Sequence, residues 1–156
     1  LLDGSGAGNG VTTGKNLSFV KADVTGRSSG VYGYDIDIKQ AATRSTHNGT
    51  AALTQQIIDA EEQITIVESG RAVNFRTTAG TNIEQTMNQL SNAMKEAGIN
   101  VELIRPKGDA ASRNAPQTLT FRHKKFGSEH FFQVASNTSG LLSKTADVSE
   151  KVKNGT

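Results

Sequence analysis

The sequence predicts an α+β fold in which one amphipathic helix packs on a face of antiparallel β-sheet. One segment repeats apolar residues at helical spacing, and short β-branched segments separated by turn residues lie on both sides of it. The length of 156 residues suits a single core. The expected order of the core unit is β-β-α-β-β-β.

The helix is expected over Thr81 to Ala97. Its apolar residues recur at intervals of four, three, four and three positions, which draws one stripe along a helix: Ile83, Met87, Leu90, Met94 and Ala97. Thr81 and Glu84 have the spacing of a capping box. Gly98 suits the left-handed residue that follows a helix.

A β-hairpin is expected before the helix. Residues 63–67 and 72–77 are apolar and β-branched, and the short loop Glu68-Ser69-Gly70-Arg71 separates them. Alternation places four residues on the inward face: Ile64, Ile66, Val73 and Phe75.

Three more strands are expected after the helix, at 99–104, 118–123 and 130–136. Leu119, Phe121, Phe132 and Val134 are their inward residues. Residues 105–117 contain Pro106 and Pro116 with several small polar residues, which predicts a long loop.

The first sixty residues are less regular. Residues 1–15 carry five glycines and predict a connector, with the domain proper at 16–156. Strands are expected at 16–21 and at Tyr34 to Lys39, where Tyr34, Ile36 and Ile38 alternate with charged residues. Residues 40–49 show no pattern, and 50–61 suit either a short helix or an irregular wrap.

Composition excludes several classes of protein. Without cysteine there is no disulfide, thiolate metal site or cysteine nucleophile. Seventeen Lys and Arg against 15 Asp and Glu is too even to indicate a nucleic acid partner. No apolar run reaches about 18 residues, so no membrane partner is expected.

The histidines raise a metal hypothesis. His123 and His130 flank a hairpin-like segment that also contains Glu129, although zinc ligands usually lie closer, as in His-x3-His. A polar turn is the alternative interpretation, and the sequence therefore predicts no metal and no cofactor. His47 lies in a polar segment without a partner nearby in the sequence.

A candidate interaction surface is basic. It comprises Arg105, Lys107, Arg113, Arg122, Lys124 and Lys125, which could meet phosphate or an acidic glycan. The alternative is an ordinary solvated turn beside core residues. Asp35 and Asp37 share an exposed strand face and could hold a cation, but no calcium-loop pattern accompanies them.

The sequence contains no recognised motif for an enzymatic activity. It contains no Gly-x-Ser-x-Gly, no His-Glu-x-x-His and no P-loop, and the glycine-rich start lacks the strand, lysine and helix of a phosphate-binding loop. We therefore expect a protein that is not an enzyme.

Two stretches resemble bacterial flagellins. Residues 1–5, LLDGS, are similar to the segment that closes the N-terminal helical part of flagellins. From 62 to 142 the order of parts resembles the flagellin IN motif, carried here by Ile64-Thr65-Ile66, Val73-Asn74-Phe75, the helix 81–97, Gly98-Ile99-Asn100-Val101, Leu119-Thr120-Phe121, Phe126-Gly127-Ser128 and 131–136. The proline-containing loop at 105–117 departs from the motif.

This resemblance implies an extracellular, secreted structural protein of the bacterial flagellum. The chain would be the surface-exposed variable domain of a flagellin involved in motility, and it would join other flagellin subunits through terminal segments outside these residues. Two alternatives are a domain of a flagellar cap or hook-associated protein, and an adhesive module that contacts a host or a glycan from the filament surface.

Overall fold

A computed structural model describes residues 12, 14, 15, 17–19, 25, 33, 35 and 37–156. The chain divides into two units, residues 1–38 and 39–156. The predicted boundary after residue 15 falls within the first unit, and the predicted strands at 16–21 and 34–39 include residues outside the described ones. Ile38, which alternation places inward, is 54% exposed.

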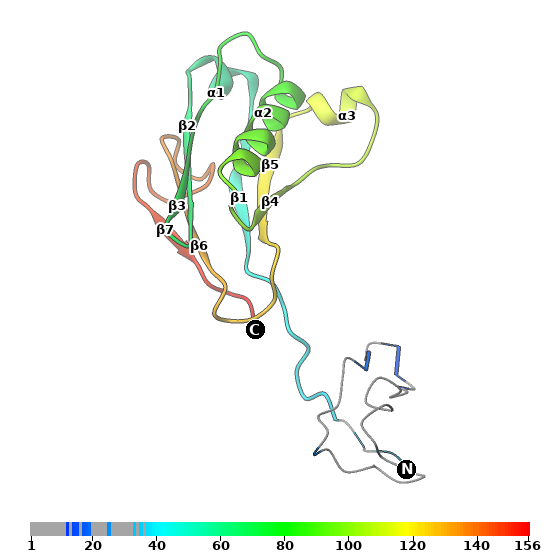
Figure 1. The fold of residues 1–156 in the computed structure, drawn as a ribbon. Helices are drawn as coiled ribbons and strands as arrows, with labels where there is room; N and C mark the ends of the chain where they lie inside the picture. The colour runs from blue at the N-terminus through cyan, green and yellow to red at the C-terminus, as the bar shows by residue number, and fades with distance from the viewer. Residues whose placement is uncertain are drawn as a thin grey trace. The chain divides into compact units, whose positions relative to one another are not determined.

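The second unit contains two antiparallel sheets that face each other (Figure 1). One has the order β1 (Thr46–Leu53), β5 (Gln117–His123), β4 (Val101–Ile104). The other has the order β3 (Arg71–Arg76), β2 (Gln63–Glu68), β6 (Phe132–Ser136), β7 (Glu150–Val152). The expected α+β class is confirmed, and from β2 to β6 the strands and the helix between β3 and β4 follow the expected order, with one further short helix between β4 and β5.

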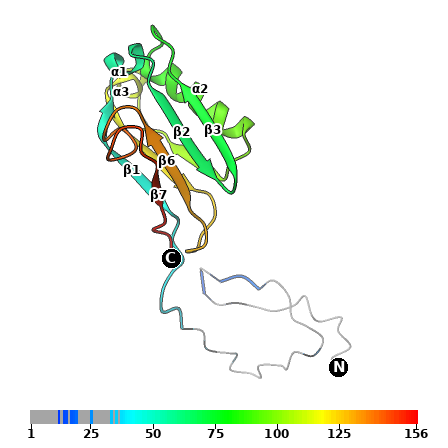
Figure 2. The same cartoon turned by 90° about the vertical axis from the view of Figure 1, so that its left-hand side faces the viewer.

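Helix α2 (Ile83–Glu96) contacts β3, beside which it lies in Figure 2, and it also contacts β4. These two strands are edge strands of the two different sheets. It therefore covers the gap between the sheets on one side. The segment after β6 covers the other side, because the carbonyl of Gly140 accepts the backbone N–H groups of Thr50 and Ala51 at 2.8 and 2.9 Å. The apolar core lies between the two sheets, helix α2 and the segment after β6, and Phe121 and Phe132 are fully buried in it.

The helix begins two residues later than expected, and its cap lies one residue later. The capping box uses Asn82, whose side chain accepts the N–H of Gln85 at 2.8 Å, while Gln85 Oε1 accepts the N–H of Asn82 at 3.2 Å. The predicted cap, Thr81 with Glu84, is wrong because the Thr81 hydroxyl donates to the Thr78 carbonyl instead. The stripe is confirmed, and Gly98 has the expected left-handed φ of 64°.

The hairpin has the expected strands and faces. Ile66 pairs with Val73 and Ile64 with Phe75, which is half-buried while the other three are buried. Ser69 and Gly70 both have positive φ, so they form the two-residue turn that suits the right-handed twist of paired strands.

Residues 46–53 form a strand, which the sequence pattern does not predict. The pattern indicates no element at 40–49 and a short helix or an irregular wrap at 50–61. A register shift between Asn48 and Ala52 interrupts the pairing with β5, so the period-two pattern of a strand is lost. A short helix, α1 (Gln55–Asp59), follows. The expected loop at 105–117 contains another short helix, α3 (Ala110–Asn114).

Candidate functional site

The six predicted basic residues come from two ends of the β4–β5 pair. Val101 pairs with His123 and Ile104 with Thr120, so the chain after β4 and the chain after β5 lead away in opposite directions. Arg105, Lys107 and Arg113 lie beyond β4, on the segment that carries α3. Lys124 and Lys125 lie beyond β5, next to Arg122, its penultimate residue. They form two groups.

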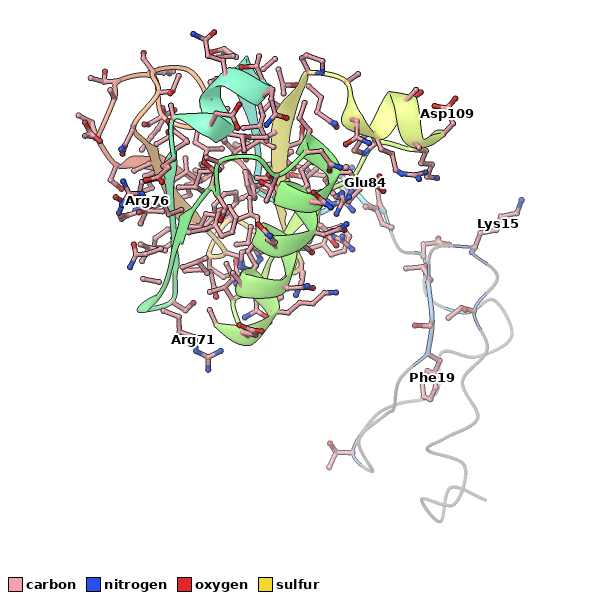
Figure 3. The ribbon with its side chains drawn as sticks, turned by 90° about the horizontal axis from the view of Figure 1, so that it is seen from above. Lys15, Phe19, Arg71, Arg76, Glu84 and Asp109 are labelled. Carbon is pink, nitrogen blue, oxygen red and sulfur yellow. The ribbon has the colours of Figure 1, made fainter. Side chains whose placement is uncertain are left out.

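Acidic and amide side chains engage the three arginines. Arg113 donates to Glu84 at 2.6 Å, across the contact between α3 and α2. Figure 3 labels Glu84 on α2 and Asp109 at the start of α3. Arg122 donates twice to Glu102, at 3.0 and 2.8 Å. Arg105 donates to the Asn88 amide oxygen at 2.7 Å. The exposed lysines, Lys107, Lys124 and Lys125, carry the remaining charge of the predicted surface.

His123 is fully buried and faces the second sheet. Its Nδ1 accepts the N–H of Lys125 at 3.0 Å, which leaves Nε2 as the protonated nitrogen. Nε2 lies 3.5 Å from Oε1 of Glu68, the last residue of β2, so the pair links the two sheets. The His130 ring stacks on His123 with centroids 5.1 Å apart.

Glu68 is a buried carboxylate, with 4% of its surface exposed. Burial opposes its charge, but hydrogen bonds from Ser69, the Asn100 N–H and His123 more than offset that effect and lower the pKa of Glu68. Glu129, the predicted companion of the histidines, is exposed and lies 3.5 Å from His130 alone. In the part of the chain that the structure describes, no group of three metal-ligating side chains converges.

Two candidate groups from the sequence remain, His47 and the pair Asp35 and Asp37. The partner of His47 is distant in the sequence: the Leu142 carbonyl lies 2.6 Å from its Nε2. Asp35 and Asp37 are both exposed. None of the described helices is long and apolar enough to cross a bilayer.

A polar junction joins the two ends of the second unit. Thr43 and Thr156 bond through backbone and side chains, with the Thr43 N–H 2.6 Å from the Thr156 carbonyl. The Asn154 amide accepts the N–H of Thr46 and donates to its carbonyl, both at 2.8 Å. The start of this unit and the C-terminus that Figures 1 and 2 mark therefore lie side by side.

Searches of protein-family models, curated proteins and solved structures found no match to this chain. The flagellin resemblance therefore stays a prediction from the residues that carry it. The burial of Glu68 and the junction are the features that the sequence interpretation missed. Glu68 continues the inward series Ile64, Ile66, so extending the strand by one residue would have placed it in the core. The junction residues are small and polar, and carry no such signal.

Proposed function

We propose that this chain is a structural domain displayed on the outside of a self-assembling bacterial filament of the flagellin type. The junction of residues 43–46 with residues 154–156 carries the proposal. A domain that projects from a polymer must receive its chain from the polymer and return it there. Two connections at one end of the domain meet that requirement without any distortion of its core.

The packing of the second unit agrees with a display role. Its sheets and helix use their apolar faces for one another, with Phe121, Leu90 and Ile66 all 1% exposed or less. Helix α2 contacts the edge strands β3 and β4, and the Gly140 carbonyl occupies the outer edge of β1 at Thr50 and Ala51, which reduces the backbone that could pair with other chains. Polymer contacts would then belong to terminal segments outside these residues.

A transplant tests this proposal. Residues 39–156 replace the variable region of an unrelated flagellin, and filaments are collected by centrifugation and labelled with an antibody against this domain. We expect filaments that form and bind the antibody along their length. A chimera that folds but fails to assemble, or filaments that hide the domain, would count against the proposal. The control is the same flagellin with its variable region deleted.

Two alternatives give different results. A cap or hook-associated protein would decorate filament ends or the hook instead of the whole length. An adhesive module that uses the basic surface would bind acidic glycans and lose that binding when Lys124 and Lys125 are changed to Glu. These two lysines are exposed in the structure, so the substitution leaves the core intact.

A further inference from the structure

A groove of about 200 Å³ lies between α2 and β4, an edge strand of the three-stranded sheet. Figure 1 shows the helix beside this strand, which it contacts. Met94 and Lys95 of α2, residues 101–103 of β4 and Lys124 line the groove. It is smaller than the usual small-molecule site of about 300–1,000 Å³, and it follows a strand edge. The backbone groups of β4 therefore decide what it can bind.

The outer backbone edge of β4 is unpaired. The Lys124 N–H donates to the Asn100 carbonyl at 2.8 Å, so this pair joins the chain at the end of β5 to the chain before β4. Hydrogen-bonded and non-hydrogen-bonded pairs alternate along an antiparallel ladder, so the N–H and C=O groups of Val101 and Leu103 point away from β5. No hydrogen bond between the described residues uses these four groups.

The opposite edge of the same sheet is blocked. On β1 the Asn154 side chain bonds the N–H and C=O of Thr46, and the Gly140 carbonyl accepts the N–H groups of Thr50 and Ala51. A further strand can therefore join this sheet at β4 and not at β1. Addition of an extended peptide to a sheet edge is a common mode of peptide recognition.

The floor of the groove is apolar. Met94, Val101 and Leu103 line it with side chains that are 2%, 2% and 8% exposed. A strand added beside β4 would direct every second side chain toward this floor, because side chains alternate between the faces of a sheet. The small volume suits the short side chains of such a strand.

The ends of the groove are basic. Lys95 and Lys124 line it at the start of β4, where Lys124 Nζ lies 3.4 Å from the Ile99 carbonyl. Arg105 directly follows the other end of β4 and donates to the Asn88 amide oxygen, while its Nε is buried without a partner. Among the described residues, none of these three cations forms an ion pair with a carboxylate.

The carboxylate on the rim does not offset this charge. Glu102 accepts two hydrogen bonds from Arg122, at 3.0 and 2.8 Å, and lies 3.5 Å from the Arg44 guanidinium. Glu96 follows Lys95 in the sequence but is not among the residues that line the groove. An acidic segment in the groove would therefore meet excess positive charge.

From these observations we propose that the groove between α2 and β4 binds an extended acidic segment of a partner protein, which joins the sheet as a further strand beside β4. The segment exchanges backbone hydrogen bonds with Val101 and Leu103, packs alternate apolar side chains on Met94, and directs its carboxylates to Lys95 and Lys124. The two predicted basic groups, at Arg105 and at Lys124, then lie at the two ends of one site. This proposal does not depend on the filament proposal.

The test is a titration of the full 156-residue chain with a short peptide of alternating Glu and Val, blocked at both ends, followed by the NMR shifts of backbone amides. We expect shifts at 91–95 and 99–105, with a Kd on the order of 1 mM that weakens as salt is added. Hydrogen exchange of the Val101 and Leu103 amides should slow several-fold, because both gain an acceptor.

Charge reversal tests the basic ends of the groove. Changing Lys95 and Lys124 to Glu should weaken binding about tenfold, since each exposed charge pair contributes little alone. The matched control changes two exposed lysines of the other sheet, Lys151 and Lys153, to Glu and should leave binding unchanged. If the Glu variant at Lys95 and Lys124 melts below the wild-type temperature, the Gln variant at the same positions replaces it. Unchanged binding in the variant that decides would overturn the site.

Modified ligands test the strand pairing. The same peptide with alternate backbone nitrogens methylated keeps its charge but cannot pair with a strand edge, so it should not bind. Equal binding of this peptide, of the peptide with Gln in place of Glu, or of digalacturonic acid would overturn the proposal. So would the absence of shifts, or shifts confined to the edge strand β3 at 71–76. Shifts of the β4 amides with protein concentration alone would also overturn it, because the occupant would then be a second copy of this chain.

Discussion

Gly49 lies where two parts of the backbone approach closely. A Cβ at this position would overlap the carbonyl oxygen of Leu141, on the segment that covers the outer side of β1. Gly49→Ala should therefore destabilise the domain by about 1–3 kcal/mol, the usual cost of overpacking. Urea unfolding of the variant measures this.

Gly70 provides the matched control for Gly49. It has a φ of 78°, and a Cβ there would meet nothing within 4 Å. Because Asn tolerates this conformation in hairpin turns, Gly70→Asn should change the free energy of unfolding by less than about 0.5 kcal/mol. Equal losses in the two glycine variants would show that the contact with Leu141 is not tight.

Glu68 should make the stability depend on pH. Its pKa is lowered in the folded state, so its stabilisation is present above the pKa of the unfolded chain, about 4.3, and is lost as the pH falls through the lower folded value. At pH 7, Glu68→Gln should cost about 2 kcal/mol, because three donors lose a charged acceptor.

The difference in the free energy of unfolding between wild type and Glu68→Gln should narrow as the pH falls from about 5 to 3. Urea titrations across that range measure it. Asp59 and Asp109 also have lowered pKa values, each chiefly through a backbone N–H, from Gly80 and Ser112, so the variant should keep part of the slope. A gap that stays constant with pH would contradict the assigned role of Glu68.

The contacts of Glu68 and His47 show why the partners of single residues could not be predicted from the sequence. Glu68 meets a histidine 55 positions away, and His47 meets a carbonyl 95 positions away. Which of several polar residues becomes buried depends on how the sheets face each other, and nothing local in the sequence records that. The alternation in β2 was the one usable signal, and it requires the strand end to be placed to within one residue.

At the level of elements, the cap of α2 predicts opposite effects for the same substitution at two asparagines, Asn82 and Asn92. Asn82→Ala should cost about 1 kcal/mol because the N–H of Gln85 loses its acceptor. Asn92, exposed within the same helix, is the control, and Asn92→Ala should stabilise by up to about 0.5 kcal/mol because Ala is the better helix former. Thermal melts of both variants test this, and a change of the same sign would contradict the assigned cap.

The apolar face of α2 should be essential for folding. Leu90 is 1% exposed, so Leu90→Asp places an unpaired carboxylate in the core and should remove more than about 4 kcal/mol. The adjacent Gln89 is exposed, and Gln89→Asp should keep a cooperative melt near that of wild type. Circular dichroism during heating separates the two. A cooperative melt in Leu90→Asp would disprove the packing of α2 on the sheets.

The elements that the sequence predicts are those with a complete local pattern. Helix α2 carries its own stripe and stop signal, and the β2–β3 hairpin carries its own turn. By contrast, β1 is stabilised by pairing with β5 some seventy residues away, and β7 has only three residues. Such strands owe their conformation to non-local partners, which outweigh weak intrinsic preferences.

For the whole molecule, antiparallel pairing of strands with a helix packed on them follows from the order of the local patterns. The division of the strands between two sheets does not, because it depends on the pairing of β1 with β5 and of β2 with β6. The predicted basic surface shows the same limit. Its six residues are close in sequence, but the antiparallel course of β4 and β5 separates them into two groups, and the structure pairs Arg113 and Arg122 with carboxylates.

The proposed display on a filament is tested most directly by electron cryo-microscopy of the flagellin chimera that carries residues 39–156. We expect helical filaments in which density for the two sheets and α2 lies at the outer radius. Two adjacent connections, at the ends where Thr43 and Thr156 meet, should lead inward to the polymer. Density for this domain within the polymer wall, or connections that leave from separate ends of the domain, would contradict the proposal.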